Sequence, residues 1–124
     1  MGRKEGKAAL GQLGEDLACA WLEQNGHTVL ARNWRSGHLE IDIISKAADG
    51  LHFAEVKSRT APVSADPEEN VGLAKQKRIT AAALRFLNGL GEDLEVSFDV
   101  ISVVFDGGTA DIEYYPGAWL PLFV

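Results

Sequence analysis

Hydrophobic residues recur along the chain with two different periods, and the change of period marks the expected helices and strands. Residues 8 to 25 are predicted to form a helix, and Gly26 follows where a helix commonly ends. A second, amphipathic helix is predicted from Val71 to about Asn88-Gly89. The apolar residues that define the two helices are Leu10, Leu13, Leu17 and Trp21 in the first, and Val71, Ile79, Ala82, Phe86 and Leu87 in the second.

Five segments are predicted to be strands, because they are largely apolar and lie between turn residues. They are "HTVLARNW" (27–34), "HLEIDIIS" (38–45), "LHFAEVKS" (51–58), "LEVSFDVISVVF" (94–105) and "ADIEYY" (110–115). Asp49-Gly50, a strong tight-turn pair, should join the second and third strands into a hairpin. The order α-β-β-β-α-β-β predicts one α/β domain over residues 1–124, with a mixed β-sheet flanked by helices.

Composition narrows the class of protein. The longest apolar runs are far shorter than the roughly 18 residues of a membrane span, and no secretory apolar block follows the first residues. Cys19 is the only cysteine, which excludes an internal disulfide and a cysteine-rich zinc site. We therefore expect a cytoplasmic protein that makes no membrane contact.

The formal net charge of -6 is unevenly distributed. Residues 1–85 hold all twelve Lys and Arg against eleven Asp and Glu, whereas residues 86–124 hold seven acids and no base. Clustered Lys and Arg supply the affinity of proteins for phosphate. Contact with nucleic acid would therefore need a local basic patch or a bound metal.

Charged residues interrupt the two strands of the predicted hairpin. Side chains alternate between the faces of a strand, so the apolar residues of 39–43 should point one way while Glu40 and Asp42 point the other. On the next strand Glu55 and Lys57 share a face with each other. If the charged faces coincide, Asp42, Glu55 and Lys57 converge.

Two converging carboxylates repel each other unless a cation lies between them, and hard oxygen ligands of this kind suit Mg²⁺. Lys57 could then hold or deprotonate the water that attacks a phosphodiester, while the metal offsets the charge developing on the phosphate. The alternative for Glu55 and Lys57 is an ion pair on a solvated sheet face, which contributes little energy.

The spacing of Asp42, Glu55 and Lys57 resembles the D...(D/E)-x-K signature of the restriction-endonuclease-like, or PD-(D/E)xK, nuclease superfamily. A longer ordered set of segments resembles the YraN family of bacterial proteins, a relative of archaeal Holliday-junction resolvases. These segments are "GQLGEDLACAWLEQNGHTVLARNWR", "LEIDII", "FAEVKSR", "AKQKRITAAALRFL" and "FDVISV". Leu39 stands where this family usually has glycine, before Glu-Ile-Asp.

The resemblance implies a restriction-endonuclease-like fold and a metal-dependent nuclease that cleaves branched or otherwise structured DNA with Mg²⁺ or Mn²⁺. It assigns Asp42 and Glu55 as metal ligands and Lys57 as the catalytic lysine. Glu15 in the first helix corresponds to the acid that completes the site in the resolvases. The helical projection alone places Glu15 on a solvent face, and Glu40 fits a solvated edge as well as a ligand role.

Basic residues offer the surface for nucleic acid. Lys75 projects into the apolar sector of the second helix, where it either covers apolar surface or contacts a phosphate beside the metal. The other members of the best basic patch are Arg35, Arg59, Lys77 and Arg78, with Arg85 beside them. Their alternative is an ordinary solvated face. His27, His38 and His52 do not have the spacing of a metal cluster.

Two further classes of function stay open: a catalytically inactive nucleic-acid-binding module, and a protein-interaction scaffold suggested by the acidic last third. We also expect the protein to act on structured nucleic acid as a homodimer or with a partner, because two copies would double a modest basic patch. The candidate contact surface is the aromatic segment "YYPGAWLPLF" (114–123). The alternative is that this segment folds back over its own core.

Overall fold

The computed structural model describes residues 3–63 and 71–121. Its elements follow the predicted order α-β-β-β-α-β-β. They are α1 (Arg3–Gln24), β1 (Thr28–Ser36), β2 (Leu39–Ala47), β3 (Gly50–Thr60), α2 (Leu73–Leu90), β4 (Val96–Asp106) and β5 (Thr109–Tyr115). Within the described part of the chain, no helix is long and apolar enough to cross a membrane.

The five strands form one mixed sheet in the order β1-β2-β3-β4-β5. β3 and β4 are parallel, and the other neighbouring pairs are antiparallel. The parallel pair follows from the connection through α2, because parallel strands need a long crossover. The hairpin between β2 and β3 is confirmed, and it turns immediately before Gly50, whose positive φ of 130° suits glycine.

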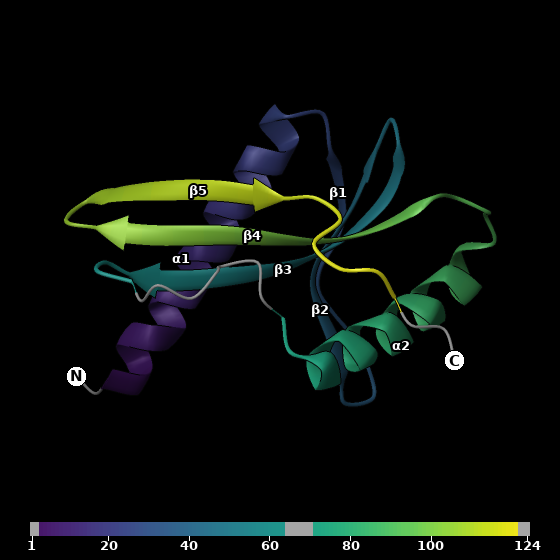
Figure 1. The fold of residues 1–124 in the computed structure, drawn as a ribbon, viewed down its shortest axis with the longest axis horizontal. Coiled ribbons are helices and arrows are strands. Elements are labelled where there is room, and N and C mark those ends of the chain that lie inside the picture. Colours follow the sequence, from purple (N-terminus) through teal and green to yellow (C-terminus); the bar gives the residue numbers. More distant parts are fainter. Residues whose placement is uncertain (1–2, 64–70, 122–124) are drawn as a thin grey trace.

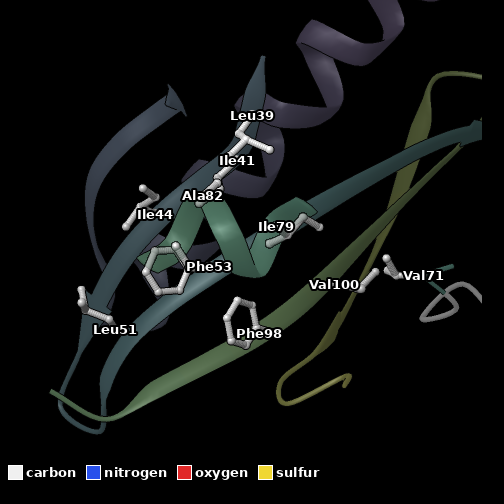
Figure 2. Close-up of a cluster of buried hydrophobic side chains, with 11 residues drawn as sticks. Leu39, Ile41, Ile44, Leu51, Phe53, Val71, Ile79, Ala82, Phe98 and Val100 are labelled. Carbon is white, nitrogen blue, oxygen red and sulfur yellow. The ribbon is translucent and has the colours of Figure 1, made fainter. Parts of the chain in front are cut away.

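Helix α2 covers one face of the sheet and encloses what we call the α2-face cluster (Figure 2). Ile79 and Ala82 of the helix pack there against Phe53 and Phe98 of the central strands. The buried members of this cluster are Leu39, Ile41, Ile44, Leu51, Phe53, Val71, Ile79, Ala82, Ala83, Phe98 and Val100. The predicted apolar face of the second helix is therefore confirmed.

Helix α1 packs on the other face, behind β3, β4 and β5 in Figure 1. The cluster beneath it, the α1-face cluster, has as its buried members Ala18, Cys19, Leu22, Ile43, Ala54, Ile101 and Val103. Leu17 and Trp21 of the predicted stripe pack against this cluster, whereas Leu13 is 48% exposed, and the fully buried residues of the helix are Ala18 and Leu22. Small residues let the helix approach the sheet: a Cβ on Gly14 would lie 1.8 Å from the Ser58 hydroxyl oxygen.

Within the aromatic segment, Tyr114, Tyr115 and Trp119 pack on the protein's own core. Trp119 stacks on Phe98 with ring centroids 4.3 Å apart, and the Ala118 N–H donates a 2.8 Å hydrogen bond to the Phe98 carbonyl. Leu120 is 83% exposed, and the last two residues of the segment lie outside the described residues. The structure thus supports the alternative to a dimer surface for the aromatic residues up to Trp119.

Candidate functional site

The candidate site lies where β2 separates from β3, the strands that Figure 1 shows bending apart. Their pairing ends at Ile43 and Ala54, whereas β4 follows β3 as far as Thr60. At this separation the Asp42 side chain takes the place of a strand partner, because its Oδ2 accepts a 2.9 Å hydrogen bond from the Val56 N–H. The site is therefore built into a fork of the sheet.

The alternation of β2 is broken at Asp42, which corrects the predicted faces. Ile41 belongs to the α2-face cluster, but Ile43 belongs to the α1-face cluster, so the apolar residues of 39–43 do not share one face. On β1 the paired residues here are Arg32 with Ile43 and Trp34 with Ile41, and Asn33 between them has a positive φ of 49°, an uncommon conformation for a residue other than glycine. This break in the alternation explains how the Asp42 side chain reaches across to β3.

Asp42 and Glu55 come together, as the sequence indicated. The pKa of the Asp42 carboxyl is raised to about 7, first by burial and then by the charge of Glu55 and a hydrogen bond between the two carboxyls. The Glu55 side chain is 9% exposed. Two acids in this arrangement hold one proton between them or need a positive charge nearby.

Two lysines lie beside this pair. Lys57 follows Glu55 by two residues on β3, so the two side chains share a face, and Lys57 is half-buried. Lys75 of α2 forms an ion pair with Glu55, and its side chain is 49% exposed. Lys75 was expected either to cover apolar surface or to contact a phosphate; it reaches over the apolar face to the acids.

Glu15 is buried, so the solvent-facing position predicted from the helical projection is wrong. Its Oε1 accepts hydrogen bonds of 3.1 Å from Arg32 and 2.8 Å from Asn33. Both residues are on β1, whose register pairs Arg32 with Ile43, so Glu15 lies against the strand beside β2 of the fork. Sequence reasoning missed Arg32 and Asn33, because neither interrupts an apolar pattern.

The remaining candidates lie on β1, β2, β3 and α2. Glu40 forms a 3.5 Å ion pair with Arg35 directly across the β1–β2 ladder, and both are exposed, which supports the solvated-edge alternative for Glu40. Lys77 and Arg78 are exposed on α2. Beyond Lys57, a pocket of about 560 Å³ is lined by Ser58, Arg59 and Thr60 of β3, Leu10 and Gly11 of α1, and Pro62 and Val63.

A second polar group, which sequence reasoning missed, lies at the other end of β3. His52 is buried and bonds Asp99 at 2.6 Å and Asp49 at 2.7 Å, while the Tyr114 hydroxyl donates a 2.5 Å hydrogen bond to Asp99. The hydrogen bond to Asp99 raises the pKa of His52 to about 9, against the effect of burial. The centroid of the His27 ring lies 4.6 Å from that of the His52 ring, so these two histidines, far apart in the sequence, are neighbours in the fold.

Metal binding by protein groups alone needs several ligands. In residues 3–63 and 71–121, no group of three or more His, Cys, Asp and Glu side chains is arranged to hold a metal ion. The raised pKa of Asp42, which burial and then Glu55 cause, nevertheless marks a place where a cation would be favourable. The acidic pair fits a hydrated Mg²⁺, which commonly takes one or two carboxylates and keeps several waters.

Comparison with known proteins gives a consistent family. A model described as "Uncharacterised protein family UPF0102" matches residues 14–103. A UPF0102 protein of Anaeromyxobacter dehalogenans is 40% identical over 119 residues, which cover 95% of this chain and 89% of the relative. Another, from Bacteroides thetaiotaomicron, is 39% identical over 90% of this chain and 93% of the relative. A third, from Desulforapulum autotrophicum, is 43% identical over 91% of this chain and 94% of its own length. The chain therefore belongs to the UPF0102 family, the YraN family that its motifs resemble.

Proposed function

We propose that the protein is a restriction-endonuclease-like, metal-dependent nuclease that hydrolyses phosphodiester bonds in structured DNA. The observation that carries the proposal is the pair of interacting carboxyls, Asp42 and Glu55, in the fork between β2 and β3. A structural role alone gives no reason to bury two acids against each other, because their mutual repulsion costs stability. A site for a divalent cation supplies that reason.

Each residue of the fork has a role in this proposal. Asp42 and Glu55 hold Mg²⁺ or Mn²⁺, and the Val56 N–H orients the Asp42 carboxylate through its 2.9 Å hydrogen bond. The bound cation supplies positive charge against the negative charge that develops on the phosphate. Lys57 orients the attacking water, since it shares a strand face with Glu55.

The DNA backbone lies, in this proposal, along the exposed basic residues around the fork. Lys77 and Arg78 are exposed on α2, Arg35 is exposed on β1, and the pocket that includes Arg59 lies beyond Lys57 on β3. These positions make a small patch rather than a basic surface, in keeping with the net charge of -6. Affinity that depends on few phosphate contacts should fall only modestly with salt.

The test is a cleavage assay with Mg²⁺ and Mn²⁺ against four-way junction, flapped, duplex and single-stranded DNA. Wild type should cleave at least one structured substrate, and Lys57→Ala should lose cleavage while retaining most of the DNA and cation affinity. An exposed acid away from the fork, Asp111, supplies a control as Asp111→Asn, which should cleave like wild type.

The alternatives have their own signatures in the same assay. DNA binding without cleavage of any substrate would favour the inactive binding module. Neither cleavage nor salt-sensitive binding would favour a protein-interaction scaffold. Dimerisation stays a prediction, and the mass in solution with and without junction DNA measures it.

A further inference from the structure

Lys75 is placed against the acidic pair from a different element of the fold. It is the third residue of α2, and its Nζ pairs with Oε1 of Glu55. The Glu55 side chain is 9% exposed, whereas that of Lys75 is 49% exposed. One end of the ion pair is therefore fixed in the fork, and the other end is free to turn toward solvent.

The spacing of the two elements produces this contact. Ile79 follows Lys75 by one helical turn and packs in the same cluster as Phe53, and Glu55 follows Phe53 by two strand residues. The four residues from Lys75 to Ile79 rise about 6 Å along the helix, and the two residues from Phe53 to Glu55 rise about 6.6 Å along the strand. The two distances are nearly equal. The packing that buries Ile79 thus brings Lys75 over Glu55.

The position is unfavourable for a lysine without Glu55. The N-cap of α2, Gly72, makes no side-chain capping hydrogen bond, and the first turn of the helix contains no acid. The positive end of the helix dipole therefore acts directly on Lys75 and repels it. Glu55 offsets that repulsion in the cation-free protein.

We infer that Lys75 is an exchangeable counter-ion of Glu55: it pairs with Glu55 in the cation-free protein and turns to a phosphate of the nucleic acid once Glu55 holds a divalent cation. This inference rests on the proposed function and adds a coupling to it. Lys75 weakens cation binding by the free protein and makes cation and nucleic acid bind cooperatively, because each favours the released lysine.

The first test is calorimetry with Mn²⁺ on wild type, Lys75→Met, Lys75→Arg and Lys46→Met. Lys46 is a matched control, because it is 47% exposed and forms a 3.7 Å ion pair with Glu92. Lys75→Met should bind Mn²⁺ about twofold to fivefold more tightly than wild type, the scale expected for loss of one partly exposed competing charge. Lys75→Arg, which keeps the charge, and Lys46→Met should match wild type.

The second test measures four-way junction DNA binding by fluorescence anisotropy in a Lys57→Ala background, which keeps the DNA intact. In EDTA, adding Lys75→Met should leave the DNA affinity unchanged, because Lys75 is then held by Glu55. In Mn²⁺ the same change should weaken DNA binding and reduce the gain in affinity that the cation gives.

The outcomes separate the two proposals. Equal or weaker Mn²⁺ binding by Lys75→Met, or equal cooperativity with DNA, overturns the counter-ion inference and leaves the cation site intact. Absence of Mn²⁺ binding in wild type and in every variant overturns the proposed function and this inference with it. For each variant, the midpoint of urea unfolding is measured as a control and should equal that of wild type.

Discussion

Replacing Asp42 by Asn should stabilise the cation-free protein at neutral and alkaline pH. The folded-state pKa of Asp42 is raised from 3.8 to about 7, first by burial and then by the charge of Glu55. Between these two values the folded protein binds a proton that the unfolded chain has released, so the unfolding free energy falls as pH rises. Above about pH 7 the full cost is present.

The raised pKa sets the size of this effect. A shift of roughly 3 units at about 1.4 kcal/mol per unit gives an upper bound near 4 kcal/mol, and we expect about 2–4 kcal/mol because the two acids share the proton. The amide group introduced by Asp42→Asn keeps an oxygen for the Val56 N–H and adds an N–H for Glu55. Packing is therefore nearly unchanged by this substitution, and the charge is removed.

The assay is urea unfolding followed by tryptophan fluorescence, in EDTA, at pH 4 and pH 8. The variant should exceed wild type in unfolding free energy at pH 8 and equal it at pH 4. Glu40→Gln is the control, because Glu40 is exposed on the same strand and its 3.5 Å pair with Arg35 contributes less than about 1 kcal/mol. Equal unfolding free energies of Asp42→Asn and wild type at pH 8 would refute the reasoning, and so would a difference of the same size at pH 4 and pH 8.

Two further predictions concern the packing of α1 and the polar group at the far end of β3. Gly14→Ala should destabilise the protein by roughly 1–3 kcal/mol, because the new Cβ would lie 1.8 Å from Oγ and 2.9 Å from Cβ of Ser58. Gly11→Ala is the control: its Cβ would have no atom within 4 Å, so it should stabilise the helix by up to about 1 kcal/mol. Urea unfolding at pH 7 compares the two variants, and equal effects on the unfolding free energy would contradict the close approach of α1 to β3. His52, whose pKa is raised from 6.5 to about 9 chiefly by Asp99, contributes stability that is fully present below pH 6.5 and is lost as pH rises through 9. The unfolding free energy of wild type should fall by roughly 3 kcal/mol over this pH range. His52→Gln should show no such fall and should be less stable than wild type at pH 7. A wild-type unfolding free energy that stays constant from pH 6.5 to 9.5 would contradict this prediction.

The order of the elements was predictable because it depends on local signals. Periods of two and of three to four residues distinguish strands from helices, and Asp49-Gly50 marks the hairpin. The convergence of Asp42 and Glu55 was also predictable, since hairpin strands that carry acids bring them near each other. Lys75 could be singled out as a charge on an apolar helix face, but its partner could not be named.

The features that escaped prediction depend on contacts between distant segments. The break in alternation at Asp42 lies beside the part of β1 that holds Asn33, whose positive φ leaves no periodic signal in the sequence. The buried face of α1 follows Gly14, Ala18 and Leu22, four positions apart, with small residues that allow close approach, rather than Leu13. Glu15 is buried for the same reason, because it lies beside Gly14 on the face turned to the sheet.

The central claim is that Asp42 and Glu55 form a divalent-cation site. The most direct measurement is a crystal structure of the protein soaked in Mn²⁺, with the anomalous signal of manganese located in the map. We predict a manganese peak within about 2.0–2.6 Å of a carboxylate oxygen of both Asp42 and Glu55, the range for hard cations and oxygen ligands. In the same crystal Lys75 should have left Glu55. A fork without manganese, with Lys75 still paired to Glu55 at saturating Mn²⁺, would contradict the account.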